Sequence, residues 1–438
     1  MKNILFQSKD PITLSFFRIL FGICFLWESI YLIKINFVTV FLTNPQVHFN
    51  YDFAEFVKPL PSGLLSLLVI GLFTASLFLI IGKYLKVAAW YLFFVFSYIL
   101  LIDKAYYNNH LYLICLLAGF FAITSSDESL SVKKGPVKQI PNWHILLFQI
   151  QLVIVYFYGG IAKINPDWLI RMEPVKTILA QKAANSSLDT ILLSDAAVYF
   201  ISYGGLVFDL LIGFLLFYRP TRKLGLIAAL IFNIMNAWLF DDINIFPFMM
   251  MGALILFIEP DTFRKFIGQY ITSIKPIDAS SNSTIPVDQK VVIGLAFYFI
   301  IQLSLPLRHL LFEGNTEWTG KAQYFSWRMK IQSRKTEQLE FAVMNYDKKE
   351  VIAVDLRSFG LNDDQLRLLS MHPETGIKMA KAIRETAEKK GLRNIEVKAK
   401  VKVSFNGRPA QMLYKDMDLS KVKEGVFEPR EYVVELKE

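Results

Sequence analysis

The stretch YFYGGIAKINPDWL places a lysine at the end of an apolar run. Lys163 closes the run, and Asp167 and Trp168 follow within five positions. A lysine at the end of a membrane helix commonly extends its amine to the lipid surface as an anchor. An amine enclosed in an apolar place instead loses its charge more easily, and a neutral amine near pH 7 can act as a general base. The two interpretations stay open here, and a lipid-soluble acid such as a hydroquinone would suit such a base.

Other polar residues lie beside apolar segments, at positions that bring them to one level of a helical bundle. LIDKAYYNNHLYL carries Asn109 and His110, and NIMNAWLFDDINIFPF carries Asn236 and Asp241. Ionisable groups at membrane depth are costly, so each raises a functional hypothesis. For His110, a plain hydrogen bond to a neighbouring carbonyl weighs equally. Asp209 is expected to be the buried partner of a basic group, and the common level predicts a shared cavity.

The composition excludes several classes of protein. Of the 438 residues, 54% are hydrophobic and only 19% are charged, whereas a soluble domain carries about a quarter charged residues. The net charge of +9 comes mostly from basic residues in short loops, which is typical of membrane topology and predicts no nucleic-acid partner. The sequence contains no HExxH, CxxC, P-loop or dinucleotide motif, so metal, nucleotide and dithiol chemistry have no support.

Nine apolar segments are candidates for membrane spans, each of which needs about 20 residues. The third, fourth, seventh and eighth are short, which predicts tilted, re-entrant or enclosed helices. The first is expected to be a retained span and not a cleaved signal peptide. The sequence therefore predicts an α-helical polytopic membrane bundle of about eight or nine transmembrane helices. The segments lie near 13–33, 62–82, 87–102, 108–124, 144–162, 196–218, 224–239, 243–258 and 289–306.

The basic residues in the loops predict the orientation of this bundle. With the N-terminus in the cytoplasm, the inner segments carry fourteen lysines and arginines and the outer loops carry seven. The positive-inside rule favours this arrangement. An odd number of spans then places the C-terminal domain on the outer, periplasmic side, together with Lys163 and His110.

The composition becomes polar near residue 307, which predicts a transmembrane catalytic domain at 1–306 and an extracytoplasmic α+β domain, rich in strands, at 307–438. Strands are expected at QLEFAVMNY, KEVIAVDLR, IEVKAKVKVSF and EYVVELK. NDDQLRLLSMHPETGIKMAKAIRETAEKKG predicts one or two amphipathic helices, with Asp363 as a cap and Gly391 as a stop. This domain either holds a substrate over the mouth of the cavity or serves as a stabilising lid.

Several stretches, taken in order, resemble the vitamin K-dependent gamma-glutamyl carboxylase family, whose membrane region belongs to the HTTM (horizontally transferred transmembrane) group. In the bundle they are DPITLSFFRILFG, DKAYYNNHLYL, YFYGGIAKINPDWL, YGGLVFDLLIGFLLFYRPTR and IFPFMMM. In the tail they are LPLRHLLFEGNTEWTGKAQYFSWRMK and VSFNGRPAQMLYKDMDL. The resemblance covers nearly the whole chain, and the length is similar to that of the short bacterial branch.

The resemblance implies a bacterial inner-membrane enzyme that uses reduced vitamin K (hydroquinone), O₂ and CO₂, and no metal. By position, the catalytic base of the family falls on Lys163 and its catalytic histidine on His110. Deprotonation of the quinol leads to its epoxide and drives γ-proton removal and CO₂ addition at a protein glutamate, giving gamma-carboxyglutamate. The residues expected to bind substrate are Asn109, Trp327, Trp168 and Asn236.

The chain departs from the family pattern at two positions. Asn233 stands where a histidine is expected, and Lys163 follows Ala162 where animal enzymes have a lysine pair. Two alternatives therefore stay open: a quinol epoxidase or oxygenase without carboxylation, and a non-enzymatic protein that binds or transports a lipid. The partners implied are membrane lipid, a vitamin K-type quinol and a glutamate-containing protein or peptide.

Overall fold

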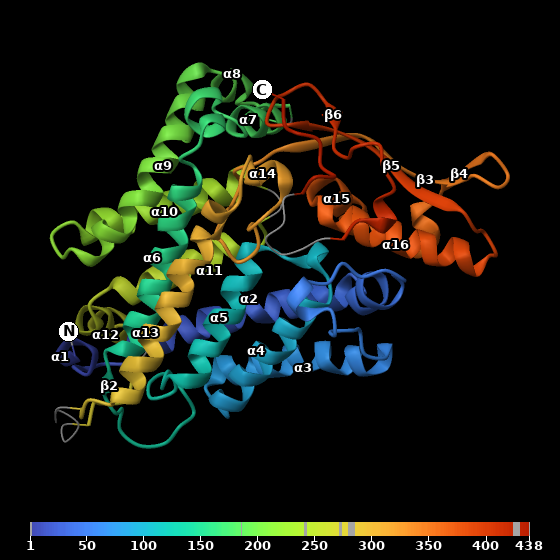
Figure 1. Cartoon of the computed structure of the whole chain (residues 1–438). Coiled ribbons are helices and arrows are strands. Elements are labelled where there is room, and N and C mark those ends of the chain that lie inside the picture. The colour runs from blue at the N-terminus through green and yellow to red at the C-terminus, as the bar shows by residue number, and fades with distance from the viewer. Residues whose placement is uncertain are drawn as a thin grey trace.

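The computed structural model shows a bundle of long helices with a small α+β domain packed against one end (Figure 1). It describes residues 2–184, 186–240, 243–270, 274–278, 285–423 and 430–437. The predicted fold class is therefore confirmed. The helices of the bundle are α1 (Lys2–Leu5), α2 (Ile12–Lys34), α3 (Ser62–Ile81), α4 (Leu85–Ile102), α5 (Asn109–Ile123), α6 (Trp143–Ala162), α7 (Val175–Ala183), α8 (Asp189–Leu192), α9 (Asp195–Phe217), α10 (Arg222–Leu239), α11 (Phe246–Ala253), α12 (Pro260–Gly268) and α13 (Gln289–Ser304).

Seven helices in the described part of the chain are long and apolar enough to cross a membrane, namely α2, α3, α4, α6, α9, α10 and α13 with its extension to Leu311. An eighth span exists if α11, extended to Phe257, is joined to α12, from which it bends by 108°. Helix α5 is apolar but has only 15 residues, fewer than the roughly 20 that a bilayer requires. All nine predicted segments are helical. The predicted shortness of the fourth and eighth is confirmed, but the third and seventh, α4 and α10, are each 18 residues long and long enough to cross a membrane.

Helices α6 and α9 approach each other closely because glycines stand at their crossing. A Cβ added at Gly160 would lie 2.8 Å from Cδ2 and 3.1 Å from the backbone nitrogen of Leu210 on α9. On α9, a Cβ at Gly213 would meet the side chain of Val153. Small residues allow this approach in membrane bundles. The crossing brings the end of α6 beside the middle of α9, where Asp209 lies.

The α+β domain, called the extramembrane domain below, is built on an antiparallel sheet with strand order β4-β3-β5-β6. The alternation predicted for β5 is confirmed, because every second residue from Val397 to Phe405 is buried and the residues between these positions are not. Helices α15 and α16 pack on this sheet and, together with residues such as Trp318 and Tyr414, complete the core. The elements are β3 (Arg334–Asn345), β4 (Glu350–Val354), β5 (Ile395–Phe405), β6 (Gln411–Met412), α14 (Thr316–Thr319), α15 (Asp363–Met371) and α16 (Pro373–Lys389). A separate pair, β1 (Ser8–Lys9) and β2 (Ile140–Pro141), joins two loops of the bundle.

Two local predictions for this domain are wrong. The cap of α15 is Asn362 and not Asp363, because the Asn362 side chain accepts the Gln365 backbone N–H at 3.1 Å and the Gln365 side chain accepts the Asn362 N–H at 3.3 Å. This reciprocal pair is a capping box. The stretch EYVVELK forms only an isolated bridge between Tyr414 and Val433. Gly391 does follow the end of α16 with a φ of +84°.

Candidate active site

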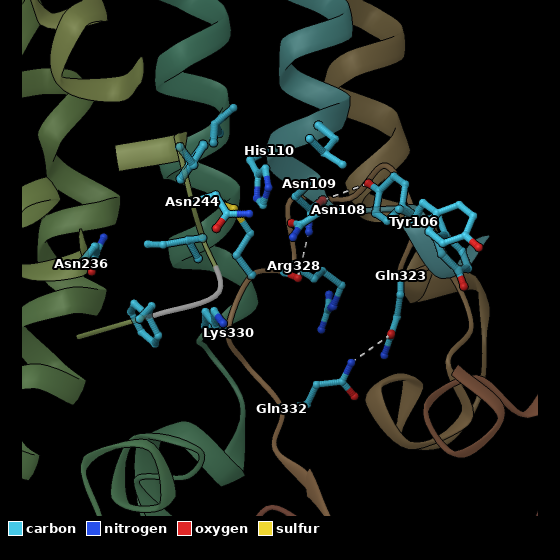
Figure 2. Close-up of a pocket in the computed structure, with 18 of the residues that line it drawn as sticks. Tyr106, Asn108, Asn109, His110, Asn236, Asn244, Gln323, Arg328, Lys330 and Gln332 are labelled. Atoms are coloured by element: carbon cyan, nitrogen blue, oxygen red, sulfur yellow. Dashed lines mark hydrogen bonds between the residues drawn. The ribbon is translucent and has the colours of Figure 1, made fainter. Parts of the chain in front are cut away.

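A cavity of about 760 Å³ lies where the bundle meets the extramembrane domain. Its walls come from α2, α4, α5, α6, α9, α10 and the start of α11, and from two segments of the tail, 323–332 and 364–372. Figure 2 shows its amide-rich part, with Asn109, His110, Asn236 and Arg328 around one space. The volume falls within the roughly 300–1,000 Å³ that small-molecule sites occupy.

Five of the six residues predicted for the site line this cavity: Lys163, His110, Asn109, Trp168 and Asn236. Trp327 does not line it. Its side chain is fully buried behind the wall and stacks on Tyr112, with ring centroids 4.9 Å apart. Its predicted role in binding substrate stays a prediction, and Asp241 lies outside the described residues.

The amine of Lys163 is held inside the wall of the cavity. Lys163 follows the last residue of α6, and its Nζ forms an ion pair with Asp209 of α9. Nζ also donates to the Gly159 carbonyl at 3.2 Å and lies 5.2 Å from the centroid of the Trp168 ring. The two paired side chains are only 11% and 7% exposed. Because a buried charge requires a partner, Asp209 provides the countercharge, and the amine is not placed as a lipid-facing anchor.

The segment that follows Lys163 is clamped by the extramembrane domain. Arg408, just after β5, donates to both carboxylate oxygens of Asp167, at 2.9 and 2.7 Å, and Asn406 donates at 2.9 Å. Burial opposes ionisation of Asp167, but these hydrogen bonds outweigh it and hold its pKa below the usual value. The adjacent Trp168 donates from Nε1 to the Ser202 carbonyl of α9 at 2.9 Å. The tryptophan beside Lys163 is thus fixed from two sides.

His110 and Asn109 occupy the first turn of α5. Asn109 accepts from the Tyr107 hydroxyl at 3.0 Å and donates to the Arg328 carbonyl at 3.2 Å, so its amide is oriented on both sides. The His110 ring lies 5.6 Å from that of Phe246 on α11. The N-terminal end of a helix carries partial positive charge. This end of the cavity therefore favours a ligand that carries negative charge.

Two family models match the chain and together cover most of it. Residues 6–262 match the HTTM domain, and residues 287–438 match the vitamin K-dependent gamma-carboxylase, lumenal domain. The chain belongs to the vitamin K-dependent gamma-carboxylase family. No solved structure matches it.

Membership of this family confirms the resemblance found in the sequence and makes the protein a carboxylase-like membrane protein. The family implies reduced vitamin K and a glutamate-containing substrate, and the description of the second domain indicates a lumenal C-terminal side. Within the described ranges, no three His, Cys, Asp or Glu side chains are grouped so that they could hold a metal ion. The division of the domains after residue 306 stays a prediction.

In this carboxylase-family protein, the tail adds a row of polar side chains to the cavity that the sequence analysis did not assign. Arg328 donates from Nε to Glu317 at 2.5 Å, and Gln332 donates to Gln323 at 3.2 Å, as Figure 2 shows. Lys330 lies 4.9 Å from the centroid of the Phe240 ring. The signal for these residues was the stretch GKAQYFSWRMK directly after the last span.

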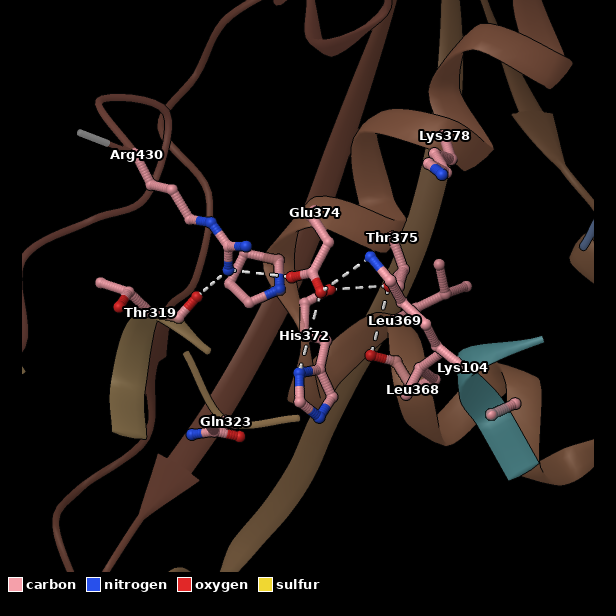
Figure 3. A network of polar contacts seen from close by, with 12 residues as sticks. Lys104, Thr319, Gln323, Leu368, Leu369, His372, Glu374, Thr375, Lys378 and Arg430 are labelled. Carbon is pink, nitrogen blue, oxygen red and sulfur yellow. Dashed lines mark hydrogen bonds and ion pairs between the residues drawn. The ribbon is translucent and has the colours of Figure 1, made fainter. Parts of the chain in front are cut away.

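A second buried network joins the bundle to the extramembrane domain (Figure 3). Glu374 pairs with Lys104 of the bundle at 3.5 Å and with Arg430 at 2.9 Å, and His372 lies 3.9 Å from it. The His372 ring stacks on Tyr324, with centroids 4.9 Å apart. Burial lowers the pKa of His372 to about 4, although the Glu374 carboxylate opposes this shift. The network fixes the segment 364–372 that covers one side of the cavity.

Proposed function

We propose that this protein is a vitamin K-dependent gamma-glutamyl carboxylase of the membrane in which Lys163 removes a proton from reduced vitamin K. The observation that carries the proposal is the enclosed pair of Lys163 and Asp209 in the wall of a cavity of about 760 Å³. The residues present fit such a quinol, because apolar side chains of α2 and α4 continue the wall beyond the polar groups. A ring and the start of a lipid chain can therefore be accommodated together.

Reduced vitamin K, when bound, supplies together with O₂ the strong base that takes the γ-proton of glutamate, and it leaves as the epoxide. The chain's own task is to hold the ring and to receive a proton at Lys163 Nζ. Only a neutral amine can receive it. Asp209 supports this step, because moving the shared proton from the ammonium to its carboxylate leaves a neutral amine at Lys163 and no net charge in the wall. When Lys163 then takes the quinol's proton, the pair carries one positive charge, and the negative charge left on the ring oxygen of the ligand compensates it.

The remaining polar groups of the cavity suit the negative charge that develops on the ligands. His110 and Asn109 stand at the positive end of α5 and lie in the wall with Lys163. Arg328 and Lys330 enter from the tail side, next to the place where a peptide from outside the bilayer would arrive. A glutamate carboxylate is the chemistry that the Lys330 ammonium attracts, beside an Arg328 that is already paired with Glu317.

The test is a comparison of Lys163→Ala with Lys182→Ala in reconstituted membranes. Lys182 also contacts a tryptophan ring, that of Trp238 at 5.6 Å, but does not line the cavity. Removal of a general base costs about 10²- to 10⁴-fold in rate, so Lys163→Ala should nearly abolish epoxide formation while Lys182→Ala leaves it unchanged. A folded Lys163→Ala protein with full activity would contradict the proposal.

The same assay distinguishes complete carboxylation from quinol oxygenation alone. Epoxide formation and CO₂ fixation into a glutamate peptide are measured separately. Asn233 favours the restricted alternative, a quinol oxygenase, because it stands where the family pattern has a histidine. Its side-chain amide donates to the Tyr156 hydroxyl at 3.0 Å and to the Ala229 carbonyl at 2.8 Å, so the position is occupied by an amide held in place. Epoxide without CO₂ fixation in the wild-type protein would establish that alternative.

A further inference from the structure

One carboxyl group in the wall of the cavity takes no part in the chemistry described above. Glu28 lies on α2, within the membrane-spanning part of the bundle, and is 8% exposed. It lines the cavity. Among the residues that the structure describes, none forms a hydrogen bond or an ion pair with its carboxyl group. Asp209, the other buried carboxylate that lines the cavity in the described part of the chain, is paired with Lys163.

An unpartnered carboxyl group at this depth is costly to keep. Removing a polar group from water without a hydrogen bond costs several kcal/mol at membrane depth. The apolar neighbours of Glu28 do not reduce this cost: Leu32, one turn later on α2, lines the cavity, and Phe25, one turn earlier, packs on Phe96 of α4 with ring centroids 5.1 Å apart. A ligand that enters the cavity can supply the missing donor.

The wall around Glu28 restricts what that ligand can be. A peptide or an ion would leave its own polar groups unsatisfied against these apolar side chains. A lipid-soluble molecule with a hydroxyl group fits, since its body packs on the apolar wall and its O–H donates to the carboxyl oxygen. A 1,4-hydroquinone carries two such hydroxyl groups on opposite sides of one ring.

We propose that Glu28 binds the second ring hydroxyl of the quinol, the one that Lys163 does not deprotonate. The inference rests on the proposed function, since it assigns the first hydroxyl to Lys163. The Lys163–Asp209 pair then binds the ring from one wall of the cavity, and Glu28 on α2 binds it from another. Glu28 selects hydroquinones over molecules that offer a single hydroxyl.

The test measures binding, without oxygen and therefore without turnover. Dissociation constants are determined in nanodiscs for reduced vitamin K and for its two monomethyl ethers, in each of which one hydroxyl can no longer donate. The wild-type protein should bind one ether roughly tenfold more weakly than the free quinol, the loss of a hydrogen bond to a carboxyl group. Glu28→Leu should bind this ether and the quinol equally, while Glu28→Gln should keep part of the discrimination through its amide oxygen.

Ser29→Ala is the matched control, because Ser29 is the next residue of α2, does not line the cavity, and donates to the Phe25 carbonyl at 2.8 Å. It should discriminate as the wild type does. Equal discrimination in Glu28→Leu and wild type would overturn the assignment of Glu28, whatever the activity of the Lys163 variant. Loss of epoxide formation in Lys163→Ala tests the proposed function separately, so the two failures can be told apart.

Discussion

Replacing Arg408 by alanine should loosen the extramembrane domain and disturb the surroundings of Lys163. Arg408 and Asp167 are 9% and 7% exposed and share two hydrogen bonds. Removing one partner of a buried pair costs about 3–5 kcal/mol. Because Asn406 still donates to Asp167, we expect about 3 kcal/mol. For a domain of this size, this loss corresponds to roughly 10–20 °C in melting temperature.

The assay is thermal unfolding of the purified protein in nanodiscs, followed through the extramembrane domain, together with the rate of epoxide formation. Misplacement of Trp168 should lower this rate by up to about 100-fold. The double variant Asp167→Ala, Arg408→Ala should recover part of the stability, because no uncompensated carboxylate remains. Recovery of stability without recovery of rate would identify the clamp as a positioning device for Trp168.

The control for Arg408→Ala is Arg357→Ala. Arg357 bonds to Asp363 at 2.7 Å, but the two side chains are 64% and 85% exposed. An exposed pair of this kind contributes about 0–1 kcal/mol. If Arg408→Ala unfolds at the same temperature as Arg357→Ala, the clamp does not hold the domain, and the reasoning from its burial is wrong.

The remaining two predictions concern the helix crossing and the buried histidine. Gly160→Ala should destabilise the bundle by about 1–3 kcal/mol and lower the rate of epoxide formation, because its Cβ would lie 2.8 Å from Leu210 Cδ2. The control is Gly294→Ala, whose Cβ meets nothing within 4 Å. This variant should leave the melting temperature and the rate unchanged. For His372, whose pKa burial lowers to about 4, the unfolded chain binds the proton more tightly, so stability should be complete above about pH 6.5 and decline between that value and pH 4. Melting temperatures across this range check it, and an unchanged melting temperature would contradict it.

The sequence predicted those features that depend on a local pattern or on a polar residue that stands out in an apolar run. Lys163 stands out in the sequence because it closes an apolar run, and Asp209 was expected to need a basic partner because it lies within another apolar run. The alternation in β5 also fixed which residues face the core. These features depend on neighbours within one or two turns of the chain.

Contacts between distant segments could not be predicted in this way. Arg408 lies 241 residues from Asp167, and no periodicity connects them. Trp327 was expected at the site, but its positive φ of 55° turns the chain so that its ring stacks on Tyr112 behind the wall. EYVVELK has the alternation of a strand, but its neighbour β6 has only two residues, too few to continue a ladder of hydrogen bonds.

The charged side chains around the cavity differ in whether the protein itself supplies a partner of opposite charge. Three basic side chains of the wall already have carboxylate partners: Lys163 with Asp209, Lys104 with Glu374, and Arg328 with Glu317. Replacing either member of such a pair leaves a buried charge without a partner, so these variants should lose stability together with activity. Glu28 has no such partner among the described residues, and its replacement by leucine removes a cost from the ligand-free protein. A variant that becomes more stable while binding the quinol less tightly is therefore the signature that sets Glu28 apart from every paired residue of the wall.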